Sequence, residues 1–192
     1  MPSTDKRQLV FEAAMKVFSS YGFRRTRLVD IAEAAGISRP ALYLLFENKE
    51  DLFRQLAIDR QRLAIEAAIE VLSEPRGLTD RITSAILEYE QIYYEPVSSS
   101  PHGAEFLEVN QSVAFQDMLA GHQRLVDLIT SEIEAAITKG DAMLPDQVGT
   151  ASDYSSLMMA SVTGQKRPSS SVEDFRRRVR GVTSVFLDAL VS

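Results

Sequence analysis

Residues 22–53 read GFRRTRLVDIAEAAGISRPALYLLFENKEDLF, and this stretch decides the fold. Its apolar positions predict two short helices, over about 28–35 and 38–45, around the turn Ala35-Gly36-Ile37. Glycine readily takes a positive φ, so it suits a tight turn that sets two helices at a steep angle. A helix-turn-helix of this kind offers its second helix to the major groove of DNA.

The start of the second helix carries side chains that suit DNA. Arg39 can pair bidentately with guanine O6 and N7, and the hydroxyl of Tyr43 can donate to a phosphate. Lys49 is expected in the first turn of the next helix, where its charge and the free N–H groups suit a phosphate. Ser38 is expected to cap the second helix through the N–H of Ala41, because Pro40 has no N–H.

The spacing of motif residues over about 6–53, without a gap, resembles the TetR family of transcriptional regulators. The motif residues are Gly22-Phe23, Thr26, Asp30-Ile31-Ala32, Ala35-Gly36-Ile37-Ser38, Leu42-Tyr43, Phe46, Asn48-Lys49-Glu50 and Leu52. The resemblance implies that the third helix of the chain enters the major groove. It implies base contacts from the residues after Ser38, which are Arg39, Pro40 and Ala41. It implies phosphate contacts from Tyr43 and Lys49, with Thr26 and Arg27 at the entry to the second helix as candidate phosphate contacts.

Three features depart from the family pattern. Arg27 stands where such proteins often have a capping serine or threonine, so either Thr26 caps instead or the cap is weaker by about 1 kcal/mol. Leu44 and Leu45 stand where polar or aromatic residues often occur, which puts one phosphate contact in doubt. Residues 1–62 hold 11 basic and 8 acidic side chains, so the head is only mildly basic. We therefore expect modest affinity for DNA or a steep salt dependence.

The rest of the chain shows helical periodicity and no convincing alternation of two residues, which predicts an all-α fold. The first expected helix ends at Gly22, and a longer one runs from Asn48 to about Leu72. Further helices are expected over about 79–94, 105–118, 122–139, 146–163 and 172–190, with a loop at 95–104. We predict a three-helix DNA-binding domain over residues 1–48. A long helix links it to an α-helical ligand-binding and dimerisation bundle over residues 49–192.

The resemblance implies that the last two helices pair with a second subunit and that the middle helices enclose an effector. Predicted interface residues lie at helical spacing and are Tyr154, Leu157, Phe175, Val179, Val182, Phe186 and Leu190; an intrachain core is the alternative for each. Aromatic, methionine and histidine residues at helical spacing are candidate ligand contacts, with ordinary core packing as the alternative: Tyr89, Tyr93, Phe106, Phe115, Met118, His122 and Met158.

Composition excludes several classes of protein. The chain has 192 residues, a net charge of −6, no cysteine and only two histidines, so thiolate and multi-histidine metal sites are excluded. No catalytic triad, phosphate loop or metal cluster is evident, so we expect neither an enzyme nor a cofactor. The N-terminus lacks a signal-peptide core and no stretch is long and apolar enough to span a bilayer, so a cytoplasmic protein is expected.

The sequence thus predicts a sequence-specific DNA-binding transcriptional regulator. The leading hypothesis is a homodimeric repressor that leaves a roughly palindromic double-stranded operator when an unknown small-molecule effector binds. The alternative is a similar regulator that activates, or that is controlled by a protein partner instead of a small molecule.

Overall fold

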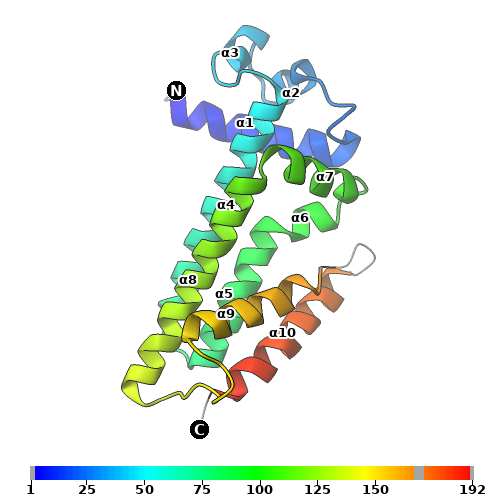
Figure 1. Cartoon of the computed structure of the whole chain (residues 1–192). Coiled ribbons are helices and arrows are strands. Elements are labelled where there is room, and N and C mark those ends of the chain that lie inside the picture. Colours follow the sequence, from blue (N-terminus) through cyan, green and yellow to red (C-terminus); the bar gives the residue numbers. More distant parts are fainter. Residues whose placement is uncertain (1–2, 167–170, 191–192) are drawn as a thin grey trace. The chain divides into compact units, whose positions relative to one another are not determined.

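The structure is a computed structural model that describes residues 3–166 and 171–190, shown in Figure 1. Every regular element within the described residues is a helix, as the periodicity predicts. The helices are α1 (Ser3–Tyr21), α2 (Leu28–Ala34), α3 (Arg39–Tyr43), α4 (Lys49–Leu72), α5 (Leu78–Tyr93), α6 (Glu95–Ser98), α7 (Gly103–Val113), α8 (Phe115–Lys139), α9 (Ala151–Thr163) and α10 (Val172–Asp188).

The chain divides into two compact units. Unit 1 contains the residues up to Gln61 together with Pro96–Met118, and unit 2 contains Arg62–Glu95 and the residues from Leu119 onward. Both α4 and α8 continue across a boundary between the units. Unit 1 therefore extends beyond residue 48 and includes a second segment of the chain, Pro96–Met118. The expected division between residues 48 and 49 separates a DNA-binding part from a ligand-binding part, and this functional division stays a proposal.

Unit 1 is built around phenylalanine rings from four parts of the chain. Phe18 of α1 has its ring centroid 5.4 Å from that of Phe23 and 5.7 Å from that of Phe53 on α4. Phe106 of α7 joins them, with its centroid 5.8 Å from that of Phe53. All four side chains are buried. Burying aromatic rings against one another supplies much of the stability of a small core, so α7 completes the core of this unit.

Helix ends in unit 1 follow from individual residues. Gly22 ends α1 with φ +80°, and a Cβ at that position would also collide with the carboxylate of Glu105. Ser38 caps α3 by accepting a hydrogen bond from the N–H of Ala41 at 3.3 Å, as expected. Asn48 accepts from the N–H of Asp51 at 2.7 Å and so starts α4. These three helix ends are confirmed.

Unit 2 packs α5, α8, α9 and α10 around one apolar core together with the C-terminal part of α4. Ile82, Ile86 and Tyr89 of α5 are fully buried, as are Leu125, Ile129 and Ile133 of α8. Figure 1 shows α9 and α10 side by side, and α10 also packs on α5, where the hydroxyl of Thr83 donates to that of Thr183 at 2.9 Å.

Several expected boundaries are wrong. The helix expected over 105–118 ends at Val113, and the helix expected from residue 122 begins at Phe115. The segment 95–104, expected as a loop, contains the short helix α6, and α7 begins at Gly103. Pro96 lies in the first turn of α6, where the missing N–H costs nothing, so a composition typical of loops is compatible with a helix. The helix expected from residue 146 begins only at Ala151, because Thr150 caps it by accepting from the N–H of Asp153 at 3.1 Å.

The described residues contain no helix with the length and apolar character that crossing a membrane requires. They also contain no group of three or more histidine or acidic side chains placed to hold a metal ion.

Gly36→Ala should lower the free energy of unfolding by about 1–2 kcal/mol, because an L side chain is strained at positive φ. The φ of Gly36 is +66° and no atom lies within 4 Å of an added Cβ, so strain of the backbone is the sole cost. Urea unfolding monitored by circular dichroism measures the change.

Gly164→Ala is the matched control, because Gly164 has φ −62° and an added methyl group meets only ordinary contacts at 3.5 Å. This control should be neutral or stabilising by about 0.4–1 kcal/mol. Equal unfolding midpoints for Gly36→Ala and wild type would show that the turn does not require a positive φ.

Candidate nucleic-acid interface

The turn between α2 and α3 is fixed by backbone hydrogen bonds. The N–H of Gly36 donates to the carbonyl of Glu33 at 3.1 Å, and the N–H of Ile37 donates to the carbonyl of Ala32 at 3.0 Å. These two bonds form the Schellman pattern that ends a helix with a residue at positive φ. The start of α3 is therefore held in place by local structure.

Burial decides which face of α3 is available. Leu42 is fully buried against α2, where Ile31 is also buried. Arg39, Pro40 and Tyr43 are exposed, and Ala41 is half-buried. The residues predicted to meet DNA from α3 therefore share the solvent-facing side of a helix whose opposite side is anchored in the core.

Arg39 and Tyr43 form a pair on this exposed face. One turn of helix separates them, and the Arg39 guanidinium lies 5.5 Å from the centroid of the Tyr43 ring. Arg39 also donates to the Tyr43 hydroxyl oxygen at 3.4 Å. The hydroxyl hydrogen of Tyr43 remains available to donate to a phosphate oxygen. The pairing restricts both side chains before any ligand arrives.

The loop that leads into α2 presents arginines and buries its threonine. Arg25 and Arg27 are exposed, and Arg27 forms an ion pair with Asp30 at 2.8 Å. Hydrogen bonds from Arg27 lower the pKa of the Asp30 carboxyl. Thr26 is only 2% exposed, and its hydroxyl donates to the carbonyl of Gly22 at 2.7 Å. The alternative that Thr26 caps α2 is wrong, and its side chain is not placed to meet a phosphate.

Lys49 is used inside the protein. Its ammonium donates to the carbonyls of Phe23 at 2.7 Å, Thr26 at 2.9 Å and Arg24 at 3.4 Å. It also lies 4.4 Å from the centroid of the Phe23 ring. An ammonium has three hydrogens to donate, so these carbonyls occupy all of them. Lys49 thus fastens the first turn of α4 to the loop after α1, and a phosphate contact requires these bonds to break.

Carboxylates from the second segment of unit 1 reduce the positive charge of the head. Arg24 pairs with Glu108 at 2.6 Å and donates its backbone N–H to Glu105 at 2.6 Å. Arg54 pairs with Asp117 at 2.6 Å. Exposed pairs of this kind contribute little to stability, but they remove arginine charge from the field that a polyanion meets.

Residues 10–56 match the family described as bacterial regulatory proteins, tetR family. The chain belongs to the TetR family. It is 31% identical over 140 residues to the HTH-type transcriptional regulator RutR of Escherichia coli strain K12, and the match covers 72% of this chain and 60% of RutR. It is 34% identical over 90 residues to the HTH-type transcriptional repressor ComR of the same strain, covering 46% of this chain and 40% of ComR.

The fold extends the likeness to almost the whole chain. A transcriptional regulator from Cytophaga hutchinsonii ATCC 33406 superposes with a TM-score of 0.76, over 96% of this chain and 98% of the other. The two sequences are 18% identical, so this comparison concerns the fold alone. The helix-turn-helix head and the helical body of this TetR-family chain therefore agree with the all-α prediction.

The predicted ligand residues are divided between the two units. Phe106, Phe115 and Met118 belong to unit 1, where Phe106 is part of the core and Phe115 is 52% exposed. Unit 2 contains the other four, Tyr89, Tyr93, His122 and Met158. Tyr89 and Met158 are buried in its core. His122 is half-buried, and its burial lowers the pKa of the imidazole, as does the charge of Lys166. Helical spacing identified the buried side chains of Phe106, Tyr89 and Met158 but not the core that each one joins, and it was wrong for the exposed Phe115.

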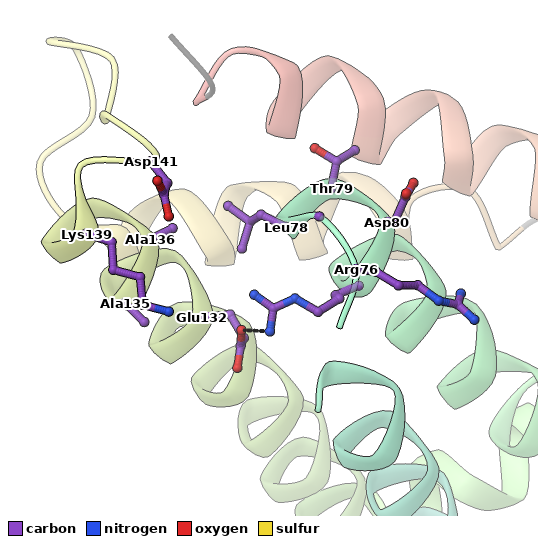
Figure 2. A pocket seen from close by; sticks show the side chains of 11 residues that line it. Arg76, Leu78, Thr79, Asp80, Glu132, Ala135, Ala136, Lys139 and Asp141 are labelled. Carbon is purple, nitrogen blue, oxygen red and sulfur yellow. Dashed lines mark ion pairs between the residues drawn. The ribbon is translucent and has the colours of Figure 1, made fainter. Parts of the chain in front are cut away.

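A pocket of about 520 Å³ opens in unit 2 at the start of α5 (Figure 2). Charged residues dominate its lining, including Arg76, Asp80, Lys139 and Asp141, and Arg81 pairs with Glu132 there at 2.7 Å. None of the predicted ligand residues lines it.

Several predicted interface residues are instead part of the intrachain core. Tyr154, Phe175, Val179 and Leu190 are at most 4% exposed within one chain, so the alternative of an intrachain core holds for them. Val182 and Phe186 are half-buried. Leu157 is 54% exposed, and Val185, which neighbours the predicted stripe, is 73% exposed. Exposed apolar side chains thus remain on α9 and on α10, and of the expected residues Leu157 is the one that is exposed.

Sequence reasoning missed a buried ion pair in unit 2. Glu90 is 1% exposed and accepts from Lys166 at 2.8 Å. A signal was present, because Glu90 follows Ile86 by four residues and so lies on the apolar face of α5. A carboxylate at such a position needs a partner that spacing alone does not name.

Lys49→Met should lower the free energy of unfolding by about 2 kcal/mol, because hydrogen bonds made by a charged group are lost while the apolar stem is kept. Thermal and urea unfolding measure this change. Lys16→Met is the control, since Lys16 is exposed on α1, and it should leave stability unchanged. If Lys49→Met kept wild-type stability but flattened the salt dependence of DNA binding by about one unit, the phosphate role would hold instead.

Proposed function

We propose that this chain is a sequence-specific DNA-binding transcriptional regulator whose α3 reads an operator in the major groove. The observation that carries the proposal is the exposed face of α3, with Arg39, Pro40 and Tyr43 on a helix that Leu42 anchors in the core. The family match over residues 10–56 supports it. This role needs no covalent chemistry and no cofactor.

The side chains divide into those that read bases and those that hold the backbone. Arg39 reads a guanine edge, and Pro40 and Ala41 allow the helix to approach closely. Tyr43, Arg25 and Arg27 contact phosphates. Leu44 is 87% exposed at the end of α3. An apolar side chain in the major groove suits the methyl group of thymine, so the departure from the family pattern is compatible with base reading.

A homodimer fits both the operator and the surface of the protein. A two-fold operator presents two half-sites, about one helical turn or a multiple of it apart, to two copies of α3. Leu157 of α9 and Val185 of α10 are large apolar side chains exposed on helices that pack together. Two copies that join these faces bury the apolar surface and form a four-helix bundle.

Repression released by a small-molecule effector is the proposed mode of control. ComR, which is 34% identical to this chain over 90 residues, is described as a repressor. Helix α4 contributes residues to both units, so a change in unit 2 has a covalent route to the DNA-binding head. Activation, or control by a protein partner, is the alternative. A coupling of about 1–3 kcal/mol between effector and DNA changes DNA affinity by about 5- to 150-fold.

The direct test is fluorescence anisotropy of the purified protein with the duplex upstream of its own coding region, over a salt series, against a scrambled duplex. Specific binding by two subunits with a steep salt slope supports the proposal. If the native duplex shows no preference, selection from random DNA decides the matter. A protein that enriches no sequence is not a sequence-specific regulator.

Arg39→Ala should weaken binding to the selected operator by about 1–3 kcal/mol and relax the preference at one base pair, because one bidentate base contact is lost. Competition anisotropy with operators substituted at each position measures both effects. Arg124→Ala removes an equal charge from an exposed position in unit 2 and serves as the control. Equal weakening of operator and random duplex by Arg39→Ala would place this arginine on the phosphate backbone.

The double substitution Leu157→Asp with Val185→Asp should convert the dimer to a monomer, because two carboxylates from each copy would be buried in an apolar interface. Both side chains are exposed in the single chain, so the monomer should keep its fold. Light scattering measures the mass, and circular dichroism checks the fold. Met143→Asp, at a residue 68% exposed in the loop after α8, is the control. A double variant that stays dimeric rejects this interface.

A further inference from the structure

A buried carboxylate in unit 2 is only half satisfied. Glu90 of α5 is 1% exposed, and its Oε1 atom accepts from the Lys166 ammonium at 2.8 Å. Its Oε2 atom is also buried and has no hydrogen-bond partner among the described residues. Buried polar atoms in native proteins are almost always paired. The unpaired oxygen of Glu90 is therefore a candidate acceptor for a hydrogen-bond donor of a bound ligand.

Tyrosines lie near this carboxylate: besides their burial, the charge of Glu90 raises the pKa of both Tyr93 and Tyr94. The Tyr93 hydroxyl, one turn further along α5, is likewise buried without a partner among the described residues. The Tyr93 ring lies 5.5 Å from that of Tyr89, and the Lys166 ammonium lies 5.0 Å from the centroid of the Tyr94 ring. Burial raises the pKa of the Tyr93 hydroxyl, and the nearby Glu90 raises it further, so the hydroxyl stays neutral. A carboxylate beside aromatic faces is the arrangement that binds organic cations.

The charges around the carboxylate favour a cation over an anion. Glu95 is a second carboxylate near Glu90, and it pairs with Arg176 at 2.6 Å. Of the cations near this cluster, Lys166 and Arg176 are each committed to a carboxylate, and Arg178 lies near the Tyr94 hydroxyl. An anionic group placed at Oε2 would be repelled by Glu90, whereas an ammonium or guanidinium group would satisfy the open oxygen.

We propose that Glu90 is the recognition carboxylate of an effector site for organic cations, in which the ligand cation donates to the open Oε2 atom and competes with Lys166 for the carboxylate. The inference rests on the proposed control by a small molecule. Lys166 stands three residues after the last residue of α9, and its side chain is 22% exposed. Its ammonium can therefore leave Glu90 for solvent when a ligand ammonium takes its place, and this change occurs three residues after a helix of the proposed dimer surface.

Isothermal titration calorimetry of the full chain with phenethylammonium tests the site. Neutral 2-phenylethanol and anionic phenylacetate are the matched ligands. The wild type should bind the cation and neither of the others. Glu90→Gln should weaken cation binding by at least about tenfold, because a charge-assisted hydrogen bond is lost. Lys166→Met should strengthen it by about tenfold or more, because the internal competitor is gone.

Two control variants change the same charges at exposed positions on α8. Glu134→Gln and Arg124→Met should leave binding of the cation at its wild-type value. Since Lys166→Met leaves a buried carboxylate unpaired, the double variant Glu90→Gln with Lys166→Met serves as a folded reference that should not prefer the cation. Circular dichroism checks each variant.

The opposite effects of the two substitutions are the decisive result. Equal binding of the three ligands to wild type and to Lys166→Met, or binding that survives Glu90→Gln, would overturn the inference. Anisotropy of the wild type on its operator, measured without phenethylammonium, tests DNA binding independently of the cation site. Specific DNA binding without a cation site removes only this inference, whereas a cation site without DNA binding removes only the proposed regulator.

Discussion

Four phenylalanine rings hold unit 1 together, and the placement of the DNA-reading helix depends on them. Phe18, Phe23 and Phe53 come from α1, the loop after it and α4, and Phe106 comes from α7. The cluster fixes α1 against α4, and α2 packs on α1 while α3 packs on α2. A helix of five residues has no stability of its own. Its exposed face is therefore presented by a core that lies elsewhere in the unit.

Much of this fold follows from the sequence, because the decisive signals are local. Gly22 and Gly36 end helices, and Ser38 starts one, through interactions within a few residues, so the motif predicts them well. Lys49 shows the limit: its spacing suits a phosphate, but its partners are carbonyls 23 to 26 residues earlier in the chain. Periodicity likewise places Phe106 on an inward face without indicating which of two cores it enters.

The net charge of each part of the molecule depends on which residues meet in the fold, and not only on where they stand in the sequence. The excess of basic residues near the N-terminus suggests a positive head, yet Glu105, Glu108 and Asp117 meet that head from residues far along the chain. In unit 2 the signs are exchanged: Glu90 and Glu95, in the acidic part of the chain, are each paired with a cation. The exposed guanidinium groups that remain on the head, rather than the net charge of the chain, are the ones a DNA duplex meets.

The split of unit 1 into two segments has a consequence for how the chain is made. The helix-turn-helix is complete on the ribosome by about residue 53, but the ring of Phe106 emerges some fifty residues later. At a synthesis rate of roughly 5–20 residues per second the interval is roughly 3–10 s. During that time Phe18, Phe23 and Phe53 lack one face of their packing, so the nascent head is exposed to chaperones and to misassembly until α7 arrives.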